Sequence, residues 1–154
     1  MTGTGICEPG DAFQAIRRIE NADDVKACFD LMRELRPHLI SADEFAARVE
    51  RQRGAGYCLV AAWEDGRPSA LAGYRIAENL VYGRYFYVDD LVTDPKARSQ
   101  GLGHRLMTWL KDEARSLNCA NFVLDTRLSN SLGQRFYFRE GLLAVSLRFH
   151  VALT

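Results

Sequence analysis

A short loop with two glycines and two arginines carries the clearest chemical signal in the sequence. It reads Arg98-Ser99-Gln100-Gly101-Leu102-Gly103-His104-Arg105 and joins a strand-like segment to a helix-like one. Glycines at a helix start let a ligand approach backbone N–H groups that are unpaired and lie at the positive end of the helix dipole. The loop therefore predicts a site for a phosphate group, with a glycine turn that binds nothing as the alternative. A Walker A ending and the third glycine of a dinucleotide-binding fingerprint are both missing from the loop.

Two adjacent acids, Asp89 and Asp90, lie inside a segment of aromatic and β-branched residues that is typical of a strand. A carboxylate in such a segment is costly unless it faces water or a partner, so the pair is a candidate for acid–base chemistry or for holding a cation. Strand alternation predicts that the two side chains point to opposite faces of the sheet, with Tyr87 on the same face as Asp89. The alternative is that one of the acids only pairs with an arginine across the sheet.

The elements that must position these residues follow from hydrophobic periodicity, capping residues and turn signals. We expect strands at 15–20, 57–63, 69–77, 85–93, 121–125 and 142–153. We expect helices between Asn21 and Pro37, between Ser41 and Gly54, at 101–117 and at 131–140. This order predicts an α/β domain of the α+β type, in which an antiparallel meander is followed by a β-α-β crossover. Residues 1–10 are expected to form a loose tail, which leaves 11–154 as a single domain.

Composition excludes several classes of protein. The chain has 154 residues, 47% of them hydrophobic, and 20 Lys and Arg balance 20 Asp and Glu. This composition is globular, and zero net charge argues against a dedicated nucleic-acid binder. No apolar run reaches the about 20 residues of a membrane span, and the first residues lack the pattern of a signal peptide. Charge is uneven, because positions 93–139 hold eight Lys and Arg against four Asp and Glu, which favours an anion-binding second half.

The four cysteines, Cys7, Cys28, Cys58 and Cys119, form no Cys-x-x-Cys pair and have no histidine cluster near them. They predict neither a zinc site nor a disulfide framework. We expect reduced thiols in a cytoplasmic protein without a bound metal. Cys28 and Cys58 lie within apolar patterns and are expected in the core.

Three motifs in one order resemble the GNAT superfamily of N-acetyltransferases. The first, Arg98-x-x-Gly101-x-Gly103 after a strand and a Pro-containing loop, is similar to the superfamily's acetyl-coenzyme A motif. Asn130 and then Tyr137-x-x-x-Gly141 are similar to its second half. The resemblance is close over 85–142 and extends loosely to most of the chain. It implies a mixed, mostly antiparallel sheet that is splayed between its fourth and fifth strands, with helices on both faces.

The resemblance also implies how acetyl-coenzyme A binds. Its pyrophosphate would lie on backbone N–H groups of Arg98, Ser99, Gln100, Gly101, Leu102 and Gly103, with His104 at the edge. The pantetheine arm would add like a strand beside Leu91, Val92 and Thr93, where a β-bulge would open a V-shaped slot between the fourth and fifth strands. Asn130 matches a position that contacts the cofactor near the next helix.

For amine acetylation the resemblance implies distinct catalytic roles. The amine must lose a proton before it attacks, since an alkylamine has a pKa of about 10.4. Asp89 matches the position of a catalytic carboxylate and is the first candidate for the base, whereas Asp90 would hold the cationic acceptor or act as the base instead. Tyr137 would protonate the departing thiolate, and a backbone N–H near Val92 would stabilise the oxyanion. Tyr87 would line the acceptor cleft.

Two further classes of function stay open at this point. One is a domain of the same fold that binds acetyl-coenzyme A as a sensor without turnover, and the other is an unrelated α/β binding domain. The acceptor is expected to be a small-molecule or protein amine, such as a polyamine, an aminoglycoside or a lysine side chain, with a protein N-terminus as another option. We expect no nucleic-acid or membrane partner. The apolar run 142–153, together with the way many members of the superfamily dimerise, favours a homodimer.

Overall fold

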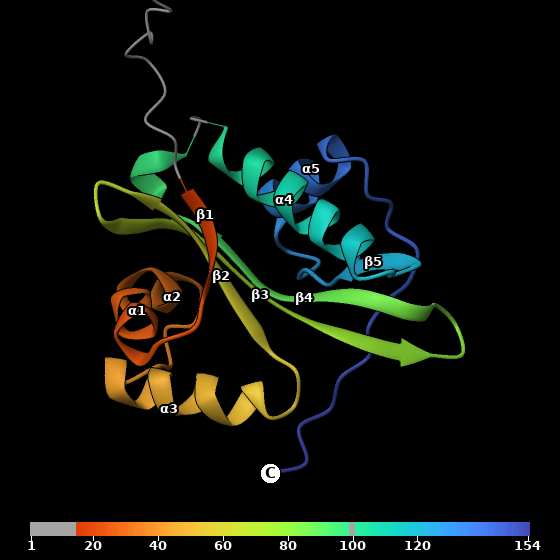
Figure 1. The fold of residues 1–154 in the computed structure, drawn as a ribbon. Helices are drawn as coiled ribbons and strands as arrows, with labels where there is room; N and C mark the ends of the chain where they lie inside the picture. The colour runs from red at the N-terminus through yellow and green to blue at the C-terminus, as the bar shows by residue number, and fades with distance from the viewer. Residues whose placement is uncertain (1–14, 99–100) are drawn as a thin grey trace, which may run out of the picture.

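The computed structural model describes residues 15–98 and 101–154 as a five-stranded sheet with helices on both faces (Figure 1). The elements in chain order are β1 (Ala15–Ile19), α1 (Ala22–Ala27), α2 (Phe29–Leu35), α3 (Ala42–Arg53), β2 (Cys58–Glu64), β3 (Arg67–Asn79), β4 (Gly83–Thr93), η1 (Pro95–Ala97), α4 (Leu102–Ser116), β5 (Asn121–Leu124) and α5 (Ser131–Arg139). The strands pair in sequence order, antiparallel except for the parallel pair β4–β5. The expected α+β fold is confirmed. The predicted tail, Cys7, Ser99 and Gln100 lie outside the described residues.

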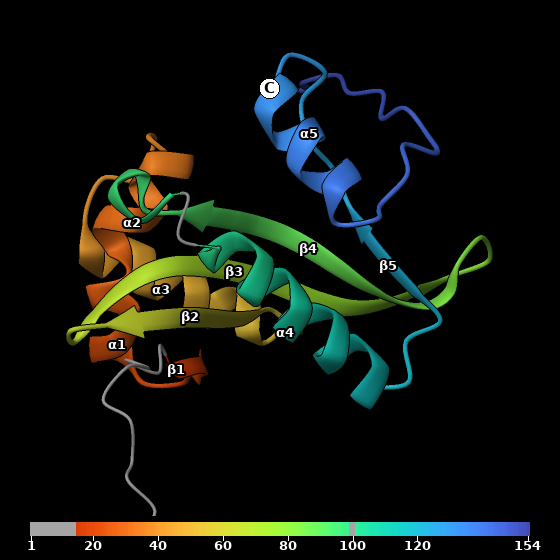
Figure 2. The same ribbon diagram turned by 90° about the horizontal axis from the view of Figure 1, so that it is seen from above.

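Two hydrophobic clusters lie on the two faces of the sheet. Helices α1, α2 and α3 cover one face, where Leu71 belongs to the same cluster as Met32 and Phe45. Helix α4 covers the other face, where Phe86 and Leu106 share a second cluster. Figure 2 shows α5 following β5, with β4 between it and α4 in that view. The face on which a strand residue points therefore decides which helices it meets.

Side-chain caps begin the helices α1 and α3, as their sequences predict. Asn21 and Ser41 each accept a hydrogen bond from the backbone N–H three residues on, at 2.8 Å and 3.1 Å. The prediction of one continuous helix between 21 and 37 is wrong, because the chain breaks at Cys28 into α1 and α2. The N–H of Cys28 bonds to the carbonyl of Val25 at 3.0 Å, and this three-residue step tightens the last turn of α1.

A β-bulge in the middle of the sheet decides where the two adjacent acids point. Gly73 pairs with Asp90 and the next residue, Tyr74, pairs with Val88, so Asp89 is an extra residue in β4. Both carboxylates consequently line one hollow beneath α2 and α3. The prediction that they lie on opposite faces is wrong, because the bulge shifts the alternation of side chains by one residue.

The strands β4 and β5 separate after four paired residues. Tyr85 to Val88 pair in parallel with Asn121 to Leu124, whereas β4 continues to Thr93 without a partner on that edge among the described residues. Figure 2 shows the two strands diverging into a V that opens toward the end of β4. The expected splay is confirmed, and the bulge that accompanies it lies at Asp89 rather than at the expected 91–93.

The strand predicted at 142–153 is wrong. This segment leaves α5 and runs past the sheet without regular secondary structure to the C-terminus (Figure 1). Every second residue is apolar and exposed, namely Leu143, Val145, Leu147, Phe149, Val151 and Leu153. Alternation of this kind describes a strand, but a strand forms only where another edge satisfies its backbone groups. The sheet of the described residues ends at β5 and does not include this segment.

The three described cysteines are free thiols with different environments. Cys28 is fully buried, as expected, and this burial raises the pKa of its thiol to about 12. Cys58 is only partly buried and packs at the margin of the α4 cluster, so its predicted place in the core is only partly right. Over 15–98 and 101–154, no helix is long and apolar enough to span a membrane.

Candidate active site

Two hollows on one face of the sheet meet at Asp89. The first, of about 300 Å³, lies beneath α2 and α3 and includes Arg36, Tyr57 and Asp90 in its lining. The second, of about 420 Å³, lies over β3 and β4 toward β5. Asp89 lines both of them, and β4 parts from β5 directly before this residue. A carboxylate thus lies where the two hollows approach the slot.

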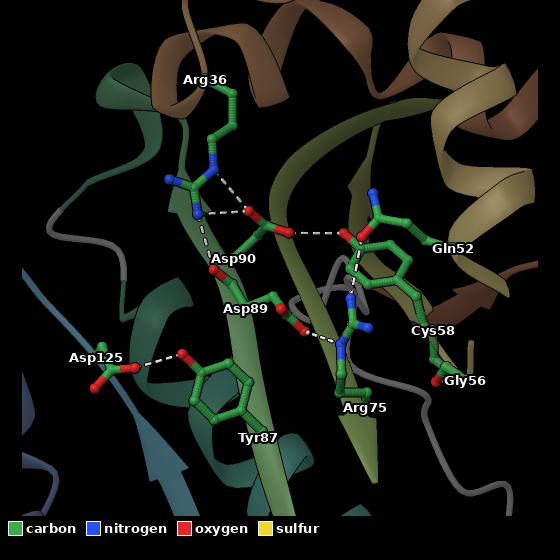
Figure 3. A network of polar contacts seen from close by, with 10 residues as sticks. Arg36, Gln52, Gly56, Cys58, Arg75, Tyr87, Asp89, Asp90 and Asp125 are labelled. Atoms are coloured by element: carbon green, nitrogen blue, oxygen red, sulfur yellow. Dashed lines mark hydrogen bonds and ion pairs between the residues drawn. The ribbon is translucent and has the colours of Figure 1, made fainter. Parts of the chain in front are cut away.

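The carboxylate of Asp90 is fully engaged by the protein. Its Oδ1 accepts from Nε and Nη2 of Arg36 at 2.8 Å and 2.7 Å, and its Oδ2 accepts from the hydroxyl of Tyr57 at 2.8 Å (Figure 3). The side chain is only 14% exposed. These bonds tie the end of α2 and the start of β2 to β4.

A glycine makes this arrangement possible. A Cβ at Gly73 would lie 2.0 Å from the hydroxyl oxygen of Tyr57, so the phenol reaches Asp90 only because β3 has no side chain at that point. Burial, followed by the charge of Asp90, raises the pKa of Tyr57 well above its usual value and keeps its hydroxyl protonated as a donor. A lone glycine inside a predicted strand indicates a β-bulge or a close approach of another group. Gly73 is therefore the residue from which the contact between Tyr57 and Asp90 could have been suspected.

Asp89 is held less completely than Asp90. Its Oδ2 accepts from Nε of Arg75 at 2.9 Å, and the same guanidinium donates to Oε1 of Gln52 at 3.0 Å (Figure 3). Asp89 therefore pairs with an arginine across the sheet, and whether this is its only role stays open. Its side chain is 25% exposed, and Oδ1 accepts no hydrogen bond from any described residue. Burial raises the pKa of Asp89, and Arg75 opposes that shift.

The backbone at Asp89 is fixed as well. Nη2 of Arg36 donates to the carbonyl oxygen of Asp89 at 2.8 Å while the same side chain holds the carboxylate of Asp90. One guanidinium thus spans the bulged residue and its neighbour. This clamp determines how the free oxygen of Asp89 is presented to the hollows.

A second polar group borders the hollow toward β5. The hydroxyl of Tyr87 donates to Oδ2 of Asp125, and Arg148 from the C-terminal segment forms an ion pair with the same oxygen. The guanidinium of Arg148 lies 5.7 Å from the ring centroid of Tyr87. Burial and the bond to Asp125 raise the pKa of Tyr87 to about 12. Tyr87 and Asp89 share one hollow, as predicted, whereas Arg75 and Arg148 were missed because no local pattern links them to it.

The start of α4 has the geometry that its glycines predict. Gly101 caps the helix with φ +72°, a left-handed conformation that favours glycine, and Leu102 begins the helix. A Cβ at Gly103 would lie 3.3 Å from the ring of Phe136, so this glycine lets α5 approach α4 closely. Nδ1 of His104 lies 3.0 Å from both carboxylate oxygens of Glu140. The N–H groups of this first turn have no acceptor within the helix.

Helix α5, which carries Tyr137, follows β5 on the side of the V opposite the end of β4 (Figure 2). Asn130 caps this helix by accepting from the N–H of Gly133 at 3.0 Å, and its amide donates to Thr126 at 3.0 Å. The ring of Tyr137 lies 5.5 Å from that of Phe136, and its hydroxyl bonds to no described residue. Burial raises the pKa of Tyr137, which keeps this phenol protonated as a proton donor.

The arrangement contains two groups that can exchange protons. A half-buried carboxylate with a free oxygen lies on the β4 side, and a protonated phenol lies on α5. The parted edge of β4 and the first turn of α4 offer backbone groups to an extended ligand that carries phosphates. Among the described residues, no cluster of three or more His, Cys, Asp or Glu side chains is placed to hold a metal ion.

Comparison with known proteins identifies relatives of this chain. A sequence model described as the acetyltransferase (GNAT) family matches residues 15–141. Glucosamine 6-phosphate N-acetyltransferase of Arabidopsis thaliana is 25% identical over 140 residues, which cover 86% of this chain and 92% of that protein. Aminoalkylphosphonate N-acetyltransferase of Salmonella typhimurium is 35% identical over 66 residues, or 43% of each chain. A solved structure of aminoglycoside N-acetyltransferase AAC(6')-Iy in complex with CoA superposes with a TM-score of 0.82 at 18% identity and covers 96% of this chain and 100% of its own.

Proposed function

Because this chain belongs to the acetyltransferase (GNAT) family, we propose that it moves the acetyl group of acetyl-coenzyme A to a small-molecule primary amine. The amine attacks the thioester directly in a ternary complex. The observation that carries this proposal is the position of Asp89, whose free carboxylate oxygen lies where β4 leaves β5. The domain comprises 11–154, and the free thiols of the described residues favour the cytoplasm as its compartment.

The cofactor lies along the slot in this proposal. The pantetheine amides bond to the unpaired edge of β4 at Leu91, Val92 and Thr93. The pyrophosphate lies on the first turn of α4, at Gly101, Leu102 and Gly103, where N–H groups and the helix dipole favour an anion. The residues before the helix, Arg98, Ser99 and Gln100, complete the loop, and His104 lies at its edge. Asn130 contributes by fixing the start of α5 beside the cofactor, as its two cap bonds support.

The reaction moves protons off the acceptor nitrogen and onto the departing sulfur. The ammonium form of the acceptor gives one proton to Asp89, and the neutral amine then attacks the carbonyl carbon of the thioester, whose oxygen is stabilised by a backbone N–H near Val92. The nitrogen releases its second proton to water as the amide forms. The carbon–sulfur bond then breaks, and Tyr137 gives its proton to the departing thiolate. A raised pKa makes Asp89 a stronger base than an ordinary carboxylate, and burial keeps Tyr137 protonated.

A thiol-release assay tests this function. Purified protein with acetyl-coenzyme A and a panel of primary amines is expected to release coenzyme A only when an amine is present. Tight binding of acetyl-coenzyme A by titration calorimetry without thiol release for any amine would favour a sensor of the same fold. Absence of binding would exclude the cofactor site itself.

Substitution of Gly103 tests the cofactor site. We expect Gly103→Asp to weaken acetyl-coenzyme A binding by more than about tenfold, since it adds a negative charge at the helix start and a side chain toward Phe136. Gly103→Ala adds the same Cβ without the charge and serves as the matched control for packing. Calorimetric affinity that is unchanged in a folded Gly103→Asp protein would contradict the assignment.

Asp90 is a structural residue in this scheme, so its loss is expected to lower stability more than catalysis. Asp90→Asn weakens the bonds to Arg36 and Tyr57, and bonds to charged groups of this kind are worth about 1.5–3 kcal/mol. We expect the free energy of unfolding in urea to fall by about 1–3 kcal/mol. Asp112→Asn, at an exposed ion pair on α4, is the control and should change it by less than about 0.5 kcal/mol. A large rise in KM for the amine at unchanged stability would return Asp90 to a role in holding the acceptor.

We also propose that the protein is a homodimer in which the exposed apolar side chains of the segment 142–154 pack against a second copy, while Arg148 keeps its ion pair with Asp125. The alternating exposed residues and the absence of a sheet partner for this segment in the described chain support the proposal. Light scattering after size-exclusion chromatography is expected to give twice the mass of the chain. Phe149→Asp should shift the protein toward monomer, whereas Leu80→Asp, at an equally exposed turn, should not. A monomeric wild type would exclude the dimer.

A further inference from the structure

We infer that the acceptor carries an anionic group beside its amine, and that this group binds in the hollow over β3 and β4. The inference rests on the proposed acetyl transfer and deepens it, because it names the chemical class of the acceptor. The hollow measures about 420 Å³ and is lined by Arg75, Ala77, Tyr85, Tyr87, Asp89 and Arg148. Two of these six side chains are cations and only one is an anion, which favours an anionic guest.

The two guanidiniums keep donors for a ligand. Arg75 is 26% exposed and uses Nε for Asp89 and Nη2 for Gln52, so its Nη1 bonds to no described residue. Arg148 is 65% exposed and pairs through Nη2 with Asp125. Its guanidinium also interacts with the hydroxyl of Tyr87, and it keeps most of its surface open to the hollow. Exposed planar guanidinium groups are well matched to phosphate and carboxylate oxygens.

Asp89 lies in the same lining as both arginines and orients such an acceptor. An ammonium or amine beside its free Oδ1 and an anion at Arg75 and Arg148 would satisfy all three charged groups of the hollow at once. The rings of Tyr85 and Tyr87 form a wall on which a short carbon skeleton or a sugar ring can lie. Asp125 competes for Arg148, so the anion gains most where it also reaches Arg75.

The same charges argue against a polyamine. The pair of acids in the sequence favours a cationic acceptor, but Asp90 is already occupied by Arg36 and Tyr57, and Asp89 is shared with Arg75. A second ammonium group on the acceptor would face the arginines of the hollow. Charge repulsion there would weaken the binding of a diamine relative to an amine of similar length that carries a phosphate.

The test compares matched acceptors and one charge variant. We expect kcat/KM for 2-aminoethyl phosphate to exceed that for ethanolamine and for 1,3-diaminopropane by at least about tenfold, and β-alanine shows whether a carboxylate serves in place of the phosphate. Arg148→Gln should lower kcat/KM for 2-aminoethyl phosphate by about 10- to 100-fold, which is the range for a lost bond to a charged group. The same substitution should change kcat/KM for ethanolamine by less than about threefold. Arg115→Gln, at an exposed ion pair on α4, is the matched control and should change neither.

The outcomes separate this inference from the function on which it rests. Transfer to ethanolamine or the diamine with no preference for 2-aminoethyl phosphate or β-alanine would overturn the inference and leave the acetyltransferase intact. An equal loss for both acceptors in Arg148→Gln would also overturn it. If no amine is acetylated, the proposed function fails. Calorimetric titration of 2-aminoethyl phosphate in the presence of coenzyme A then tests whether the hollow binds an anionic amine. Binding that Arg148→Gln abolishes supports the site, and absent or unchanged binding excludes it.

Discussion

Removing the hydroxyl of Tyr137 is expected to lower kcat by at least about tenfold, and by up to about 10⁴-fold, with little change in the affinity for acetyl-coenzyme A. General acid catalysis is worth about 10² to 10⁴ in rate, and Tyr137→Phe keeps the ring that packs 5.5 Å from Phe136. The phenol bonds to no described residue, so its loss leaves no protein group unpaired. Steady-state kinetics with saturating acetyl-coenzyme A, together with calorimetric affinity, measure the two effects separately.

The pH dependence sharpens this expectation. Burial raises the pKa of Tyr137 above the ordinary value of 10.0, so the phenol stays protonated, and able to donate, to a higher pH than a free tyrosine. The loss of kcat at high pH should therefore begin above pH 10 in the wild type and disappear in Tyr137→Phe. Tyr82→Phe, in the turn between β3 and β4, is the matched control and should behave as the wild type. A Tyr137→Phe protein with wild-type kcat would leave Tyr137 a packing role only.

Replacing Asp89 by asparagine is expected to lower kcat/KM by about 10² to 10⁴ and to remove the acidic limb of its pH profile. The change keeps the size and polarity of the side chain but deletes the proton acceptor next to the slot. Burial raises the pKa of Asp89 above the ordinary 3.8, so the wild-type limb should lie above that value. Activity across pH with saturating acetyl-coenzyme A measures the change.

Arg75 supplies an independent check on the sign of this shift. Its hydrogen bond and charge lower the pKa of Asp89, in opposition to burial. Arg75→Gln should therefore raise that pKa further and move the acidic limb to higher pH. Asp112→Asn serves again as the control for a lost surface charge. Wild-type profiles in both Asp89→Asn and Arg75→Gln would show that the amine gives its proton to solvent or to another group.

The sequence determined the features that depend on neighbouring residues. The caps at Asn21 and Ser41 and the glycine start of α4 at Gly101 all involve groups within a few positions of one another. Such contacts form wherever the local backbone allows them, so their residue types and spacing are sufficient to predict them. The positions of the five strands along the chain followed from hydrophobic periodicity, which is also a local property. The parted strands were implied by the resemblance to the GNAT superfamily.

Only the tertiary structure decided where the carboxylates of Asp89 and Asp90 point and which groups they contact. Strand alternation holds until pairing with another strand breaks it, and the bulge at Asp89 arises in β4 opposite Gly73 of β3. The partners that distinguish the two carboxylates, Arg36 and Arg75, belong to α2 and β3 and lie 54 and 14 positions away. The alternating segment 142–153 failed to become a strand for a related reason, because its backbone needs an edge that the described chain does not provide. Local pattern fixes which conformation a segment prefers, whereas pairing between distant segments fixes which groups meet.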